Sequence, residues 1–255
     1  MSFGAEALAV GVMNTNAVQK HRGQVIWYDT AILPAIEPNV FDPGWLRHTD
    51  RLTGTSNGRN TAWFLRYHGR DMVLRHYWRG GMMGKLIKDM YLRVPVDKSR
   101  AMREFKLLQW MKVQDLPVPR PVAACFSPVG PAYRADLLME RIADAQTIAD
   151  LLTRHALSHE DWMKVGEVIA RMHLSGVYHS DLNCRNILLD RRGKVWLIDF
   201  DKCERRPPGG WCQENLERLK RSLTKVKAGL PEFFWEETDF KALLQGYQDL
   251  MHSSC

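Results

Sequence analysis

Residues 179–201 read HSDLNCRNILLDRRGKVWLIDFD, in which two short apolar runs, ILL and VWLI, are separated by the polar turn DRRGK. Apolar runs bounded by turn signals predict two brief β-strands. Asp181 precedes the first run, Asn186 follows Asp181 by five residues, and Asp199 comes directly after the second run. A carboxylate can accept a proton, and amide and carboxylate oxygens are ligands for hard cations. We therefore expect the chemistry of the protein to lie in this segment.

This arrangement resembles the catalytic loop and the metal-binding loop of protein kinases. The resemblance implies that Asp181 accepts the proton of an acceptor hydroxyl, and that Asn186 and Asp199 hold magnesium against the phosphates of ATP. ATP and Mg²⁺ are accordingly the expected cofactors. His179 is expected to brace the loop by hydrogen bonding. Each polar residue alone would also suit a solvated turn, but their combination favours the catalytic interpretation.

The half of the chain before this loop is rich in predicted strands. Runs at 61–67 and 72–77 are joined by the turn HGRD and predict a β-hairpin. Apolar residues at near-helical spacing predict one amphipathic helix over 98–114, which stops before a Leu-Pro pair. Two further strands are expected around 122–126 and 136–142.

The half of the chain around and after the loop has a mainly helical pattern. Ser158, with Asp161 three residues later, predicts the start of a helix, and Gly176 predicts its end. The remaining expected elements are strands at 187–189 and 195–198, and helices at about 213–227 and 238–252.

These elements predict an α+β, two-lobed, protein-kinase-like fold. Residues 45–143 are expected to form an N-terminal lobe of antiparallel sheet plus one helix. Residues 144–255 are expected to form a reduced, mainly helical C-terminal lobe of the same catalytic domain. Residues 1–44 contain three prolines and little periodicity, and we interpret them as an N-terminal extension.

A Gly/Ser/Asn loop precedes the first strand of the predicted hairpin. Gly54, Ser56 and Gly58 in this loop could cradle nucleotide phosphates through backbone amides, because glycine lets the chain approach a ligand closely. The loop departs from the pattern G-x-G-x-x-G, and a plain hairpin loop explains it equally well.

Two basic residues are candidates for the remaining phosphate contacts, one of them with an acidic partner. Arg75 stands where the third strand of a kinase carries its phosphate-binding lysine, and Glu104 in the following helix could pair with it. Arginine supplies the charge with a different geometry, so Lys85 is a second candidate. A solvated helix face is the alternative for Glu104.

The stretch LLMERI at 137–142 is expected to connect the two lobes. Backbone groups from Glu140 to Ile142 would hydrogen-bond adenine, and Met139 would line the adenine pocket. An ordinary edge strand is the alternative interpretation.

The segment after Asp199 differs from that of a protein kinase. Only residues 200–255 follow, they contain no Ala-Pro-Glu triplet, and Ser180 replaces the arginine that reads activation-loop phosphate in many protein kinases. We therefore expect a small or lipid-linked acceptor and no peptide-docking helices. Asp201 and Lys202, beside the metal-binding Asp, are expected to help shape the acceptor side.

Several segments between roughly residues 50 and 225 together resemble the 3-deoxy-D-manno-octulosonic acid (Kdo) kinases of Gram-negative bacteria. They are VLRHYWRGGMMGKLIKDMYL, REFKLLQWM, PVPRPVAA, YHSDLNCRNILLD and VWLIDFDKCERR. The resemblance implies an ATP-dependent kinase that phosphorylates the 4-hydroxyl of Kdo on a lipid A precursor, in lipopolysaccharide inner-core biosynthesis. It also implies a peripheral place on the cytoplasmic face of the inner membrane. A lipopolysaccharide heptose kinase would share the catalytic residues and stays an alternative.

Basic residues gather in two segments that suit an anionic membrane surface. Lys85, Lys88 and Arg93 alternate with apolar residues, and the helix expected at 213–227 has a basic face opposite its leucines. That face consists of Arg218, Lys220, Arg221, Lys225 and Lys227. Both segments would equally suit the solvated side of a core element. The five cysteines lie in no zinc-binding or disulfide-framework spacing, which indicates a reducing compartment such as the cytoplasm.

Two other classes of protein remain open. A catalytically silent, kinase-like binding module would explain the missing strand lysine and the irregular glycine loop. A nucleic-acid binder would explain the net charge of +7. The sequence contains no recognisable reading element with stacking aromatics, so nucleic acid is not an expected partner.

Overall fold

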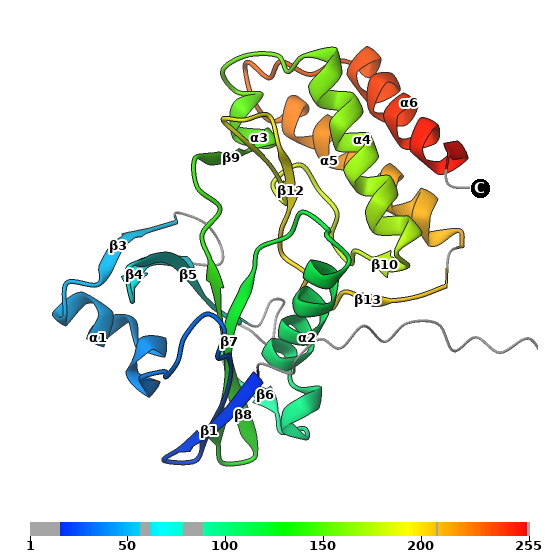
Figure 1. Ribbon diagram of the computed structural model, residues 1–255. Coiled ribbons are helices and arrows are strands. Elements are labelled where there is room, and N and C mark those ends of the chain that lie inside the picture. Colours follow the sequence, from blue (N-terminus) through cyan, green and yellow to red (C-terminus); the bar gives the residue numbers. More distant parts are fainter. Residues whose placement is uncertain (1–15, 57–61, 79–88, 208, 254–255) are drawn as a thin grey trace, which may run out of the picture.

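The computed structural model describes residues 16–56, 62–78, 89–207 and 209–253. The chain forms two lobes, with an antiparallel sheet in the lower half of Figure 1 and a group of helices in the upper half. The segment after β8 is the connection between the lobes, followed by short strands and helices only. The predicted α+β, two-lobed fold is confirmed.

The large sheet contains eight described strands, paired antiparallel in the order β1-β2-β7-β8-β5-β4-β3, with β6 paired to β8. Three of these pairs, β2 with β7, β8 with β5 and β6 with β8, join strands that are not consecutive along the chain, so the order of the sheet depends on long-range pairing. The strands are β1 (Asn16–His21), β2 (Gln24–Asp29), β3 (Leu52–Thr55), β4 (Ala62–Tyr67), β5 (Arg70–His76), β6 (Tyr91–Leu92), β7 (Pro121–Val129) and β8 (Ala132–Glu140).

The structure differs from the expectation that residues 1–44 form an extension. Strands β1 and β2 are a hairpin at the edge of the sheet, and β2 pairs with β7. The following segment, with the 3-10 helix η1 (Pro38–Phe41) and the helix α1 (Pro43–His48), packs on one face of the sheet. Its apolar residues have no regular spacing, so periodicity does not predict their burial.

The two faces of the sheet have separate cores because side chains alternate along each strand. On β5, Met72 and Leu74 are fully buried in the core below α1, whereas Val73 and Arg75 face the other way. The second face is covered by the helix α2 (Arg100–Val113), which packs on β7 and β8. The core between the sheet and the N-terminal segment includes Ile26, Ile32, Leu33, Ile36, Val40, Phe41, Leu46, Leu65, Val122, Cys125 and Leu138.

The upper lobe contains four helices among the described residues: α3 (Ile148–Leu151), α4 (His159–Leu174), α5 (Trp211–Ala228) and α6 (Glu237–Ser253). Its strands are β9 (Ala145–Thr147), β10 (Val177–Tyr178), β11 (Ile187–Asp190), β12 (Val195–Leu197) and β13 (Glu204–Arg205). Ser158 and Asp161 form the predicted capping box of α4, and Gly176 follows its end with a φ of 69°. None of the helices in the described ranges is both long and apolar enough to cross a lipid bilayer.

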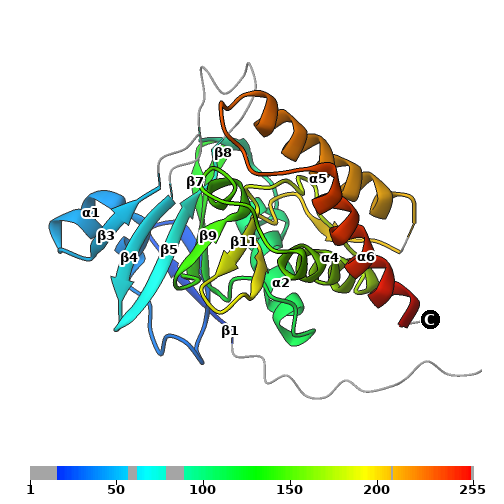
Figure 2. The same cartoon turned by 90° about the horizontal axis from the view of Figure 1, so that it is seen from above.

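Helices α4 and α6 run side by side in both views (Figures 1 and 2) and touch through two glycines. A methyl group added at Gly166 would lie 2.0 Å from the carbonyl oxygen of Leu243, and one added at Gly246 would lie 2.2 Å from that of Met163. Both contacts are far inside van der Waals range and involve backbone atoms that cannot rotate away. The absence of a side chain at these positions therefore sets the separation of the two helices.

We expect Gly166→Ala to force α4 and α6 apart and to lower the free energy of unfolding by about 1–3 kcal/mol. Thermal unfolding followed by circular dichroism measures the effect. Gly210→Ala is the matched control, since a methyl group there meets no atom within 4 Å. Equal melting temperatures for the two variants would contradict this account of the helix pair.

Candidate active site

The loop after β10 is held by a buried histidine. The backbone N–H of Asp181 donates to Nδ1 of His179 at 3.2 Å, so the proton of the imidazole lies on Nε2, which donates to the carbonyl oxygen of Ile198 at 3.1 Å. Burial lowers the pKa of His179 and keeps the ring neutral. His179 thus makes the bracing hydrogen bonds that the sequence predicts, and it joins the loop to the strand that leads to Asp199.

Asp181 and Asn186 lie on the same short loop, and their side chains have different surroundings. Asn186 is buried, and its Nδ2 donates to the carbonyl oxygen of Asp181 at 2.9 Å. Its Oδ1 is therefore the atom that can face a cation. The Asp181 side chain is 60% exposed, and its Oδ2 accepts a hydrogen bond from Asn183. The loop presents one carboxylate to solvent and one amide oxygen to the interior.

Helix α5 holds the same loop from the other side through three residues at helical spacing. Asn215 is buried and exchanges hydrogen bonds with the backbone of His179, and Ser222 accepts from the N–H of Cys184 at 3.1 Å. Between them, Arg218 donates to Oδ1 of Asp181 at 3.2 Å. Sequence analysis did not identify the anchoring pair, although polar residues at i, i+3 and i+7 of an otherwise leucine-lined helix are a visible signal.

Asp199 lies two residues after the end of β12 and has a φ of 65°, a left-handed conformation that is unfavourable for a residue with a side chain. Such conformations persist where surrounding contacts hold them, and they are frequent at functional sites. The carboxylate of Asp199 accepts from Arg75 at 2.5 Å. Burial acts to raise the pKa of Asp199, but the positive charge of Arg75, its hydrogen bond and the other favourable interactions of the carboxylate together outweigh burial, and the pKa is lowered.

Arg75 of β5 and Glu104 of α2 form the ion pair that the sequence suggests. Glu104 is buried and also accepts from the Tyr77 hydroxyl at 2.6 Å and from the N–H of Phe200 at 3.2 Å. The alternative of a solvated helix face is therefore excluded. Burial raises the pKa of Glu104 to about 7, and the nearby charge of Arg75 opposes this rise.

A cavity of about 460 Å³ lies between the two lobes, within the size range of small-molecule sites. It brings together eight of the predicted site residues. These are Ser56, Arg75, Glu104, Met139, Glu140, Ile142, Asn186 and Asp199. The cavity is also lined by residues that sequence analysis did not identify, among them Phe64, Leu108, Thr147, Asp150, Leu188 and Ile198.

The structure places other predicted residues elsewhere. Gly54 is part of β3 and pairs with Phe64, so it does not belong to a loop. Asp201 is bound by Arg100 at the start of α2, which ties its carboxylate to the sheet lobe. The adjacent Lys202 is exposed. Gly58, Lys85 and Lys88 lie outside the described residues.

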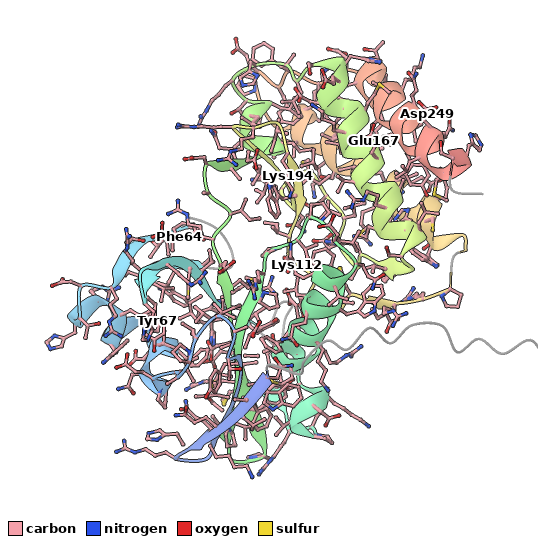
Figure 3. The ribbon with its side chains drawn as sticks, in the orientation of Figure 1. Phe64, Tyr67, Lys112, Glu167, Lys194 and Asp249 are labelled. Carbon is pink, nitrogen blue, oxygen red and sulfur yellow. The ribbon has the colours of Figure 1, made fainter. Side chains whose placement is uncertain are left out.

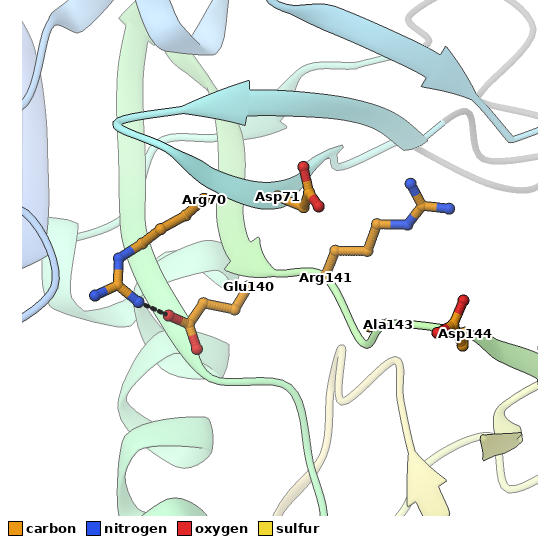
Figure 4. A pocket seen from close by; sticks show the side chains of 6 residues that line it. All are labelled: Arg70, Asp71, Glu140, Arg141, Ala143 and Asp144. Carbon is orange, nitrogen blue, oxygen red and sulfur yellow. Dashed lines mark hydrogen bonds and ion pairs between the residues drawn. The ribbon is translucent and has the colours of Figure 1, made fainter. Parts of the chain in front are cut away.

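The hinge segment after β8 directs two neighbouring side chains in opposite directions (Figure 4). Glu140 turns toward Arg70 and forms an ion pair with it at 2.8 Å. Arg141 extends the other way, and its guanidinium lies 4.5 Å from the ring centre of Phe64. The backbone N–H groups of both hinge residues are engaged, that of Glu140 with Arg120 and that of Arg141 with Asp71.

Two lysines from different lobes approach one indole behind the hinge. Nζ of Lys112, near the end of α2, lies 5.9 Å from the ring centre of Trp196, and Nζ of Lys194 lies 4.3 Å from it. Figure 3 labels both lysines in the region where α2 meets the upper lobe. Burial, together with the positive charge of Lys194, lowers the pKa of Lys112. The contact of Lys112 with Trp196 connects α2 of the sheet lobe to β12 of the upper lobe.

The two-lobed fold and the groups around this cavity define a protein-kinase-like phosphotransferase. The model of the lipopolysaccharide kinase (Kdo/WaaP) family matches residues 44–247, and the chain belongs to this family.

Curated relatives agree with the family assignment. The chain is 44% identical over 223 residues to a 3-deoxy-D-manno-octulosonic acid kinase of Vibrio vulnificus, which covers 88% of this chain and 94% of the relative. A protein of the same name from Vibrio parahaemolyticus is 41% identical over 89% of this chain and 96% of its own length. A third protein of this name, from Actinobacillus succinogenes, is 39% identical over 84% of this chain and 91% of its own length. The expected family resemblance is therefore confirmed.

The elevated pKa of Glu104 predicts how the free energy of unfolding depends on pH. Because the folded-state pKa of about 7 lies above the ordinary value of 4.5, the folded protein binds a proton that the unfolded chain has already lost. The contribution of Glu104 to the unfolding free energy should therefore fall as the pH rises from about 4.5 to about 7, by on the order of 3 kcal/mol in total. We expect Glu104→Gln to remove this slope.

Urea unfolding at several pH values measures the difference between wild type and variant, which cancels the contributions of other titrating groups. Glu160→Gln, at an exposed position on α4, controls for the loss of one carboxylate. A difference between wild type and Glu104→Gln that is constant across this pH interval would refute the assignment.

Proposed function

We propose that the protein is an ATP- and magnesium-dependent kinase that phosphorylates the 4-hydroxyl of Kdo on a lipid A precursor. The observation that carries the proposal is that Asn186 and Asp199 line one cavity together with Arg75 and Glu104. Asp181 lies on the same loop as Asn186, which donates to its carbonyl oxygen. The names of the relatives, 3-deoxy-D-manno-octulosonic acid kinases, suggest the acceptor class.

The nucleotide is proposed to occupy the cavity between the lobes, with adenine at the hinge. Met139, Leu188 and Ile198 provide apolar lining. Since the N–H groups of Glu140 and Arg141 are bound to other backbone atoms, we assign the donor for adenine to the N–H of Ile142. The predicted hydrogen bond from the backbone of residues 140–142 to adenine is thus assigned to the N–H group of Ile142.

The donor set at the other end of the cavity suits magnesium. Mg²⁺ prefers oxygen ligands and is commonly held by one or two carboxylates together with substrate phosphates. Asp199 is ionised, and Asn186 has its Oδ1 available, so these two residues would hold the ion. When bound, the ion supplies positive charge that balances the phosphate oxygens.

Phosphate transfer follows from the position of Asp181. The acceptor hydroxyl gives its proton to the Asp181 carboxylate, and the hydroxyl oxygen bonds to the γ-phosphorus. The bond from that phosphorus to the bridging oxygen breaks, and ADP leaves with the electron pair. Arg75, which lines the cavity, is proposed to contact the phosphates in the place of a kinase lysine.

The proposed site of action is the cytoplasmic face of the inner membrane, to which the protein would attach peripherally. The net charge of +7 supports attraction to anionic head groups and to the phosphates of a lipid A precursor. In the described part of the chain, the side chains of Arg93 and of the basic residues of α5 are exposed or partly exposed, so they can contact such a surface.

We expect Asp181→Ala to reduce phosphate transfer to the Kdo-bearing lipid A precursor by at least about 100-fold, because proton removal from the acceptor is lost. Mass spectrometry of the lipid after incubation with magnesium and ATP measures the gain of one phosphate. Asp249→Ala, at an exposed position on α6, is the matched control. Transfer to a heptose-bearing acceptor alone would replace the proposed acceptor, and turnover unaffected by Asp181→Ala would indicate a silent module.

Asp199→Asn should separate metal binding from nucleotide binding. It removes the carboxylate charge but keeps a side chain of the same size, so we expect the gain in ATP affinity on adding Mg²⁺ to fall by at least about 10-fold. Isothermal titration with ATP, with and without Mg²⁺, measures this gain. An undiminished effect of Mg²⁺ in the variant would remove Asp199 from the metal site.

A further inference from the structure

Arg218 lies beside the proposed catalytic base on the side that faces solvent. Its Nη1 is 3.2 Å from Oδ1 of Asp181, and the two side chains are 45% and 60% exposed. The cavity for the nucleotide is lined by Asn186 and Asp199 but not by Asp181 or Arg218. The guanidinium is therefore placed where an acceptor approaches and away from the proposed nucleotide position.

The position of Arg218 is fixed by its neighbours on α5. Asn215, one turn earlier, and Ser222, one turn later, bind backbone atoms of the catalytic loop. Arg218 lies between these two residues. Asn215 and Ser222 bind the backbone of the loop, whereas Arg218 contacts the side chain of Asp181. Because α5 and the loop are joined on both sides of Arg218, the backbone of Arg218 is held close to Asp181.

The pair of Arg218 with Asp181 leaves most of the guanidinium available. An arginine side chain carries five N–H donors in a planar fork, and one of them is used by Asp181. Exposed ion pairs contribute little free energy, so a second anion can compete for the guanidinium. Arg185, exposed on the same loop, adds positive charge nearby. The arrangement therefore suits a small anionic group bound next to the base.

We propose that Arg218 binds the carboxylate of an acidic acceptor sugar and thereby places the sugar hydroxyl at Asp181. This inference rests on the proposed function and names the residue that recognises the carboxylate of the sugar. A 3-deoxy-2-ulosonic acid carries its carboxylate on the second carbon, and a single methylene separates that carbon from the one bearing the 4-hydroxyl. One sugar can therefore reach Arg218 with its carboxylate and Asp181 with its hydroxyl. A neutral heptose lacks the carboxylate, so Arg218 selects against it.

The test compares two acceptors that differ in one charge: a lipid A precursor with one Kdo, and the same molecule with its Kdo carboxyl converted to the methyl ester. For the acid, we expect Arg218→Ala to raise KM by roughly 10- to 100-fold, because a charge-assisted pair is lost. For the ester, the same substitution should change KM little. Arg218→Lys should retain part of the preference, since it keeps the charge and loses the fork.

Arg171→Ala is the matched control, because Arg171 is 44% exposed and pairs with a surface aspartate, Asp115, in the same way. It should behave as wild type on both acceptors, and thermal melting should show that all variants are folded. An equal loss on the acid and on the ester would overturn the inference, since Arg218 would then act only on the loop. Failure of wild type to phosphorylate the acid acceptor would overturn the proposed function itself. The two results differ because an equal loss in Arg218→Ala can be seen only when wild type is active.

Discussion

The charge of Arg75 connects the parts of this protein that must act together. It lies on β5 and binds one carboxylate from α2 and another from the end of β12, which is 124 residues away in the chain. A buried charge without partners is strongly unfavourable, so the three elements are held in one arrangement. Glu104 adds a second connection by accepting from the N–H of Phe200. This small network of buried and partly buried charges therefore joins the lobes, alongside the ion pair of Arg100 with Asp201.

The loop after β10, which is proposed to carry the catalytic base, is held by a different kind of interaction. Its backbone is bound by the neutral ring of His179 from within the lobe and by Asn215 and Ser222 from α5. These are hydrogen bonds between neutral groups that are buried or partly buried. The side chains of Asp181 and Arg218 are left half exposed at the surface. A loop fixed through its backbone can present charged side chains to an acceptor without a large rearrangement, which is the requirement for a preorganised site.

The N-terminal segment contributes to this site indirectly. Met72 and Leu74 of β5 are buried below η1 and α1, on the face of the sheet opposite α2. Arg75, the next residue of the strand, points to the cavity because side chains alternate. Covering the far face of the sheet thus helps to fix the strand that carries the arginine. The segment is part of the lobe that binds the proposed nucleotide.

The sequence by itself determined the features that depend on local geometry. The spacing of Asp181 and Asn186, the short strands around them and the capped helix α4 follow from periodicity and from hydrogen bonds within a few residues. Only the tertiary structure decided the burial of the apolar side chains between residues 32 and 46, the strand position of Gly54 and the place of Arg218 beside Asp181. Those outcomes depend on contacts between segments far apart in the chain, and neither periodicity nor local propensity contains the information that pairs them.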